Sequence, residues 1–293
     1  MKLLLALALL AAPAPAVKLP TMQSLVEAAR TGDDVELERL GRRLGAPRLL
    51  KAAAAGPKAE RLAALRALPL TDGAWAELSS LAPLLADGDG EVAEAAARAA
   101  QRIAQAMTRD TAFAEEIPPD VPREAARALW SAAGEKAALP SVRASAIAAA
   151  ASLGRQLAAP PLDGAALDAL LTDGDPQVRR AAVEALDARK EAARLARALG
   201  DPDDAVAAAA GASACAGVPP VRAPSEKPLA VDEAGRARIR VLVLDEKLQL
   251  ADRLDLIPCL RAFATLADRK LLDDLAKSDV ESIKRRARSY GGR

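Results

Sequence analysis

The residues of this chain best suited to chemistry are aspartates paired at short spacing: Asp87/Asp89, Asp173/Asp175 and Asp203/Asp204. Two close carboxylates can hold a divalent cation or act as acid and base. Each pair, however, lies between two stretches with helical hydrophobic spacing. There a carboxylate accepts hydrogen bonds from the first amide groups of the next helix. The pattern therefore predicts helix caps, with no catalytic, cofactor or metal site.

The absence of histidine limits the chemistry further. Histidine is the usual general base near neutral pH and the commonest nitrogen ligand of metals. Serine and cysteine nucleophiles therefore have no histidine partner to activate them, and neither a glycine-rich phosphate loop nor the EF-hand spacing occurs. We predict that the protein is not an enzyme and binds no cofactor.

The two cysteines, Cys215 and Cys259, are a candidate disulfide. They lie nine residues beyond Val206 and nine beyond Leu250, on helices expected to be equivalent in successive repeats. A bridge requires Cα atoms within about 7 Å of each other. The alternative is that both are unpaired, buried, small apolar residues.

Residues 1–16 have the parts of a secretory signal. Lys2 is the charged residue, residues 3–12 are the apolar segment, and Ala14-Pro15-Ala16 is a cleavage site of small residues. The apolar segment is shorter than the ~20 residues that span a bilayer. We expect an exported mature chain beginning at Val17, periplasmic or extracellular, without stable membrane insertion after cleavage. The alternative is an apolar N-terminal helix.

Residues 167–186 define the structural unit of the chain. Leu167, Leu170 and Leu171 form the stripe of one amphipathic helix. Gly174 is expected to end this helix in a left-handed conformation. Asp175 can cap a second helix that begins at Pro176 and carries its own apolar stripe. Neither helix can bury its stripe alone, so the unit requires neighbours.

The unit recurs along the chain. Its marker valines are Val92, Val142, Val178 and Val206, at intervals of 50, 36 and 28 residues. The corner aspartate, the valine, the following basic residue and the alanine pair resemble short bacterial HEAT repeats of the phycobilisome-lyase-like type; this is clearest at Asp175, Val178, Arg179, Ala181 and Ala182. The basic residue is present at Arg143 and Arg179, and alanine replaces it at positions 93 and 207. The resemblance implies an all-α fold, an α-solenoid of stacked antiparallel helix pairs.

The resemblance also implies where a partner binds. In HEAT-like proteins the second helix of each pair lines the concave face. The residues of this chain that it would bring there are Arg98, Arg102, Arg143, Arg179, Arg180 and Glu184. We expect a non-catalytic scaffold that binds a protein or peptide partner on this face. Two alternatives remain: a lyase-like or chaperone-like accessory protein that positions a cofactor or client, and a purely structural envelope component.

Composition argues against nucleic acid as the partner. There are 41 basic and 40 acidic residues, and only 2% of the chain is aromatic. HEAT-like DNA glycosylases need a basic groove with aromatic residues, and HEAT-like iron hydroxylases need histidine ligands. A basic bias occurs only near the C-terminus, at Lys284, Arg285, Arg286, Arg288 and Arg293. It is expected to be a solvated cap of the helical stack, the alternative being a docking site for an acidic partner.

Four segments describe the expected organisation: the signal (1–16), helical repeats (17–216), a proline-rich linker or loop (217–231), and C-terminal repeats with a cap (232–293). Residues 108–122 are expected to be a loop because their prolines cannot lie inside a helix. Residues 238–244 could form a strand, but their apolar spacing favours a helix.

Overall fold

The computed structural model describes residues 20–109, 115–157, 162–187, 190–216 and 231–291. In these ranges it contains helices and no strand, which confirms the predicted all-α, solenoid-like fold. The chain divides into two compact units, unit 1 up to Ala74 and unit 2 from Trp75 onward. The predicted signal at residues 1–16 lies outside the described residues.

Unit 1 is a small group of helices around a leucine core. Its elements are α1 (Met22–Thr31), α2 (Asp34–Leu44), α3 (Ala46–Ala55), α4 (Lys58–Ala67) and the 3₁₀ helix η1 (Leu68–Leu70). Helix α1 packs against both α2 and α4, and α3 packs against α4. Leu25, Leu37, Leu49 and Leu65 are fully buried. Arg66 links α4 to the other helices, donating to the carbonyl of Ala29 and to the carboxylate of Asp34.

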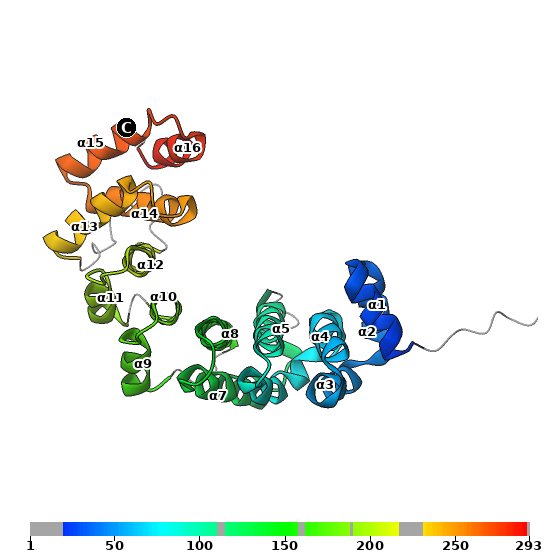
Figure 1. Ribbon diagram of the computed structural model, residues 1–293. Coiled ribbons are helices and arrows are strands. Elements are labelled where there is room, and N and C mark those ends of the chain that lie inside the picture. Colours follow the sequence, from blue (N-terminus) through cyan, green and yellow to red (C-terminus); the bar gives the residue numbers. More distant parts are fainter. Residues whose placement is uncertain (1–19, 110–114, 158–161, 188–189, 217–230, 292–293) are drawn as a thin grey trace, which may run out of the picture. The chain divides into compact units, whose positions relative to one another are not determined.

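Unit 2 is a series of helix pairs (Figure 1). Its elements are η2 (Ala74–Glu77), η3 (Ser79–Ala86), α5 (Gly90–Arg109), α7 (Asp120–Gly134), α8 (Pro140–Leu157), α9 (Gly164–Leu171), α10 (Pro176–Glu184), α11 (Ala192–Ala198), α12 (Asp204–Ala214), α13 (Glu233–Leu244), α14 (Leu250–Phe263), α15 (Leu266–Leu275) and α16 (Glu281–Tyr290).

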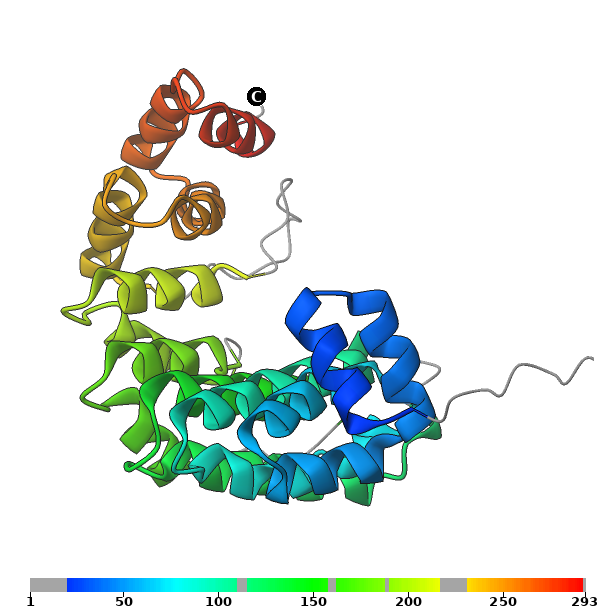
Figure 2. The same ribbon diagram turned by 45° about the vertical axis from the view of Figure 1, so that its right-hand side comes forward.

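The helices of unit 2 form two layers, seen from two directions in Figures 1 and 2. The second helices of the pairs pack successively on one another in the order α5, α8, α10, α12, α14, α16. We call them the second-helix layer. Each also packs against its own first helix, namely η3, α7, α9, α11, α13 or α15 in turn. These form the first-helix layer.

Small side chains allow this close stacking. Helices α8, α10, α12 and α14 each touch two neighbouring second helices and their own first helix. Seven of the eleven residues of α12 are alanine, and residues 206–211 are all buried. A Cβ atom on Gly211 would lie 2.6 Å from Leu256 of α14. The alanine-rich, aromatic-poor composition therefore follows from helices packed at short axial distance.

Two proline positions change the predicted helix boundaries. The apolar spacing of residues 74–85 predicts one α-helix, but these residues form the 3₁₀ helices η2 and η3, with Pro83 inside η3. Proline removes an amide donor and clashes with the preceding turn, which disfavours an α-helix there. The predicted loop 108–122 is also too long, because α7 already begins at Asp120. Pro122 lies in its first turn, where the amide group would have no helical partner.

The proline-rich segment predicted at 217–231 lies outside the described residues except for Val231. Helices α12 and α14, which lie on either side of it in the sequence, pack against each other within unit 2. The boundary between the two compact units falls at residues 74 and 75. Residues 233–244 form helix α13, which confirms the preference for helix over strand.

The expected left-handed conformation of Gly174 is wrong. The described glycines with positive φ are Gly32, Gly45 and Gly73. Helix α9 ends instead through Thr172, whose hydroxyl donates to the carbonyl of Asp168. The chain then turns around Asp173, whose carboxylate accepts the amide of Asp175.

Replacing Gly32 by alanine should therefore cost about 1 kcal/mol of stability, the penalty for a side chain in a left-handed conformation. Gly32 ends α1 at φ 74°. Gly174→Ala is the matched control, because an added Cβ meets no atom within 4 Å at either position. Urea unfolding of both variants measures the difference. Equal losses of free energy would contradict the assigned backbone conformations.

Candidate functional site

The corner aspartates act as turn and cap residues, as predicted. In each corner the first carboxylate accepts the amide of the second aspartate, at 2.9 to 3.0 Å. The second carboxylate accepts the amide two residues further on, at 2.8 to 3.0 Å. The pairs are Asp87/Asp89, Asp173/Asp175 and Asp201/Asp203. The third pair was predicted as Asp203/Asp204, but Asp204 begins α12 and pairs with Arg238 of α13.

Two arginines connect these corners into a ladder. Arg143 on α8 donates to Asp173 at 2.7 Å, and Arg179 on α10 donates to both carboxylate oxygens of Asp201 at 2.8 and 2.9 Å. Each arginine thus reaches the corner of the following pair. The Arg143 and Asp173 side chains are 6% and 10% exposed, so water screens this ion pair little. The ladder stops at Ala207, which has no guanidinium group.

The ladder changes the assignment of two predicted partner-binding residues. Arg143 is buried, and its Nε donates to the carbonyl of Ala133 at 2.8 Å. The Arg179 side chain is only 14% exposed, and its Nη1 donates to the carbonyl of Asp173 at 2.9 Å. Both side chains hold neighbouring helix pairs together, and neither is exposed enough to contact a binding partner.

The same position is used in other helix pairs, which sequence reasoning missed. Arg143 and Arg179 are each the fourth residue of their helix, and so are Arg61 of α4 and Arg253 of α14. Arg61 donates from Nε to the carbonyl of Ala53 at 2.8 Å, and Arg253 donates to that of Val243 at 2.9 Å. An arginine three residues after the start of a second helix is therefore the signal that identifies this contact.

The ladder should make stability depend on pH. The hydrogen bond from Arg143 lowers the pKa of Asp173 below its ordinary value, although burial acts in the opposite direction. A carboxyl group with a lowered folded pKa stabilises fully above its unfolded pKa of about 3.9, and this contribution is lost as the pH falls through the folded pKa. The stability difference between the wild type and Asp173→Asn should thus be larger at pH 5 than at pH 3. Urea unfolding at both values tests this, and a constant difference would contradict it.

Arg180 and Glu184, two further predicted partner-binding residues, belong to an ion-pair network. Arg180 donates to Glu184 at 2.9 Å and to both oxygens of Asp252, at 2.7 and 3.2 Å. Asp252 is on α14, and α12 packs between α10 and α14. The arginine can reach across α12 because that helix carries mainly alanine. This network joins α10 to α14 and neutralises the charge of Arg180.

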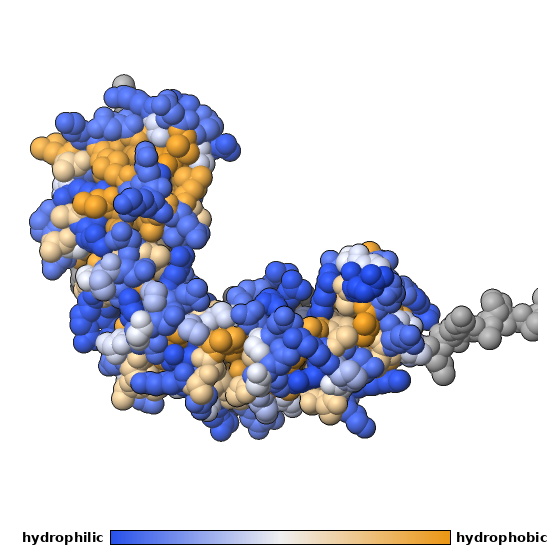
Figure 3. Space-filling view, viewed as in Figure 1, coloured by the Kyte–Doolittle hydropathy of each residue, from blue (hydrophilic) through white to orange (hydrophobic). Residues whose placement is uncertain are grey.

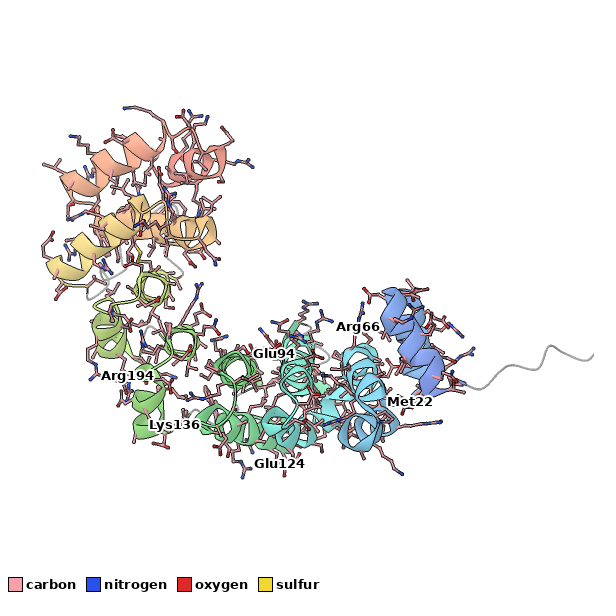
Figure 4. The ribbon with its side chains drawn as sticks, viewed as in Figure 1. Met22, Arg66, Glu94, Glu124, Lys136 and Arg194 are labelled. Atoms are coloured by element: carbon pink, nitrogen blue, oxygen red, sulfur yellow. A yellow bond between two sulfur atoms is a disulfide. The ribbon has the colours of Figure 1, made fainter. Side chains whose placement is uncertain are left out.

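Arg98 and Arg102, the remaining predicted partner-binding residues, are exposed on α5. The Arg98 side chain is 61% exposed and lies 3.5 Å from Glu94. In the described part of the chain, no carboxylate lies within ion-pair distance of Arg102. Figure 4 shows Glu94 on α5 and Glu124 on α7 at opposite sides of the two layers. Of the predicted partner-binding arginines, Arg98 and Arg102 of α5 are thus the two exposed to solvent.

The first-helix layer has its own ion pairs. Arg194 of α11 donates to Asp168 of α9 at 2.8 and 2.9 Å and also pairs with Glu191. Hydrogen bonds to these two carboxylates raise the pKa of Arg194, so its charge is permanent. Figure 4 labels this side chain between its two helices. Its partners identify it as a structural contact.

The cysteines are paired in the structure. The Cα atoms of Cys215 and Cys259 are 5.4 Å apart, and their sulfurs form a disulfide between the end of α12 and helix α14. Both residues are buried, at 3% and 0% exposure. The contact lies in the core of unit 2, where it ties together two second helices on either side of the proline-rich segment.

The C-terminal basic residues largely make contacts within the last helix pair. Lys284 pairs with Glu281 at 2.6 Å, Arg286 lies over the ring of Tyr290, and Arg288 donates to the carbonyl of Ala276. Arg293 lies outside the described residues. These contacts favour the interpretation of a cap that closes the stack.

Exposed apolar side chains gather at another place, over α13 and α14 in Figure 3. Val241 and Leu244 of α13 are 57% and 53% exposed, and Leu250 at the start of α14 is 43% exposed.

In the described ranges, no group of three histidine, cysteine or acidic side chains is placed to hold a metal ion. No described helix is both long and apolar enough to cross a membrane.

Comparisons with known proteins do not assign the chain to a family. No protein-family model and no curated protein matches the chain. Among solved structures, the chain is similar to an engineered protein whose crystal structure was determined by the Northeast Structural Genomics Consortium. The two share 18% identity with a TM-score of 0.36, over 92% of this chain and 82% of that one. A likeness of this size carries no argument about family or function.

Proposed function

We propose that the mature chain is an exported, non-catalytic scaffold that binds a protein or peptide partner on the exposed face of the second-helix layer. The observation that carries the proposal is the contrast within this layer. Arg143, Arg179 and Arg180 are engaged by carboxylates of neighbouring helix pairs, whereas Arg102 of α5 is exposed to solvent. Repeat proteins commonly use such an extended helical surface for binding.

The resemblance to short HEAT repeats supports the same surface, because the second helices line the binding face in that family. The use of the corner aspartates as caps and ladder residues supports a non-catalytic role, since it accounts for the carboxylate pairs without a substrate or metal.

The paired cysteines support export, because disulfides persist mainly in oxidising compartments. We expect the mature chain to begin at Val17. N-terminal sequencing of protein recovered from the periplasm or the medium tests this. Recovery only from the cytosol with Met1 intact would contradict it.

Site-specific photo-crosslinking in the native host tests the binding face. A photoreactive amino acid at Arg102 places the probe on the second-helix layer, and the same amino acid at Arg127 places it on α7 of the first-helix layer. Both arginines are exposed. We expect one defined crosslinked partner from position 102 and none from position 127. Equal crosslinking from both positions, or none from position 102, would contradict the proposed face.

A further inference from the structure

Helix α5 carries a row of long polar side chains along its exposed face. The row is formed by Arg98, Gln101, Arg102, Gln105 and Arg109. Spacings of three and four residues place these side chains on one side of the helix. From Ala95 to Arg109 the helix contains no acidic residue, and Glu94, just before this stretch, lies 3.5 Å from Arg98. We call these five residues the α5 row.

The neighbouring helix α8 adds no negative charge to this surface. The hydroxyl of Ser141 in its first turn donates to Glu94 near the start of α5, at 3.1 Å. The two helices pack along their lengths and therefore run in the same direction. Helix α8 has no acidic residue, and its Arg155 donates to the carbonyl of Glu184 at the end of α10, at 3.2 Å.

Small side chains cover α8 between its two ends. Ser145, Ala148 and Ser152 are partly exposed and follow Ser141 at helical spacing. They stand beside the long side chains of the α5 row. A bound chain could therefore approach the backbone of α8 closely while the arginines contact it from one side.

We infer that the α5 row binds an acidic peptide segment of a partner protein. This inference rests on the proposed function and names the chemistry of the partner. Arginine binds carboxylates through two parallel hydrogen bonds. The carboxamides of Gln101 and Gln105 can both donate and accept, as pairing with peptide groups requires. The surface thus offers charge recognition for acidic side chains and hydrogen bonds for the peptide backbone.

A peptide fits this surface better than a nucleic acid does. Single-stranded nucleic acids are usually bound by stacking their bases on aromatic side chains. Neither α5 nor α8 contains an aromatic residue. The chain as a whole has a net charge of only +1, so no broad positive field is present to attract a polyanion.

Fluorescence anisotropy with defined probes tests the inference on the mature chain, residues 17–293. The main probe is a labelled decapeptide of alternating glutamate and alanine, with alternating glutamine and alanine as the neutral control. An oligonucleotide of ten thymidines and vesicles of phosphatidylserine represent the other two polyanion classes. We expect the glutamate peptide to bind, at least tenfold more tightly than the neutral peptide, and the affinity to fall as salt is added.

Charge reversal locates the binding. The double variant Arg98→Glu/Arg102→Glu should weaken binding of the glutamate peptide at least tenfold. Arg123→Glu/Arg127→Glu is the matched control, with two exposed arginines at the same spacing on α7. It should change the affinity less than twofold. Unchanged thermal unfolding by circular dichroism shows that both variants are folded.

Three outcomes would overturn the inference: equal weakening by both double variants, no preference for the glutamate peptide, or tighter binding of the oligonucleotide or the vesicles through Arg98 and Arg102. None of these would by itself remove the proposed function. A partner crosslinked from position 102 would still show that the second-helix layer binds a protein, although not through acidic residues.

Discussion

Replacing Asp268 by alanine should destabilise the protein by about 3 kcal/mol, the cost of breaking a buried ion pair. Asp268 is completely buried and accepts from Arg240 at 2.7 Å and from the hydroxyl of Thr265. Its carboxylate also closes the capping box that begins α15. Burial alone would raise the pKa of Asp268, but the hydrogen bonds from Arg240 and Thr265 outweigh it and lower the pKa. Replacing Asp268 by alanine removes all of these hydrogen bonds together.

Urea unfolding at pH 7 measures this loss, and Asp274→Ala on the same helix is the control. Asp274 is 59% exposed and lies 4.0 Å from Lys277, so its loss should cost no more than about 0.5 kcal/mol. Replacing both members of the buried pair, as in Arg240→Met/Asp268→Leu, should cost less than Asp268→Ala, because no buried charge is left unpaired and the second partner of Arg240, Glu233, is 71% exposed. Similar losses for Asp268→Ala and Asp274→Ala would contradict the buried position of Asp268.

Removing the disulfide should cost about 4 kcal/mol. The bond closes a loop between residues separated by 44 positions, which restricts the unfolded chain. Cys215→Ala, Cys259→Ala and the double variant should lose similar amounts, since each lacks the same bond. A reductant should destabilise the wild type and leave the double variant unchanged. Two free thiols titrated in unfolded, non-reduced mature protein would contradict the pairing.

Most helix boundaries could be predicted because the capping and helix-breaking residues lie next to the helix ends in the sequence. Helix α4 begins after Gly56 and Pro57, and α10 begins at Pro176 behind the capping Asp175. These signals act within a few residues and need no tertiary contact. The 3₁₀ geometry of η3 was missed because the apolar spacing around Pro83 is compatible with an α-helix. The backbone of Gly174 was assigned incorrectly because Asp173 and Thr172 already stabilise the turn.

The candidate site could be predicted only in part. The sequence indicates that Arg98, Arg102 and Arg179 lie on second helices, but it does not show which of them meet carboxylates. Arg180 and Asp252 are 72 residues apart, and their contact depends on the small side chains of the helix between them. Such a contact is set by three-dimensional stacking, which no local pattern encodes.

A physical difference separates the arginines that hold helix pairs together from those that are exposed on α5. In unit 2, Arg143 and Arg179 at the helix corners each donate to a carbonyl of their own pair and to a carboxylate of the next pair, where burial strengthens the ion pair. The arginines of the α5 row lie further along their helix, away from any corner. Position along the second helix therefore separates structural from exposed arginines.

The affinity of the crosslinked partner for two tryptophan variants tests the central claim most directly. Arg102→Trp adds bulk and removes a charge on the second-helix layer, and Arg127→Trp makes the same change on the first-helix layer. Calorimetric titration of the purified partner should show at least tenfold weaker binding to Arg102→Trp and less than a twofold change for Arg127→Trp. Unchanged affinity for Arg102→Trp, or a larger loss for Arg127→Trp, would contradict binding on the second-helix layer.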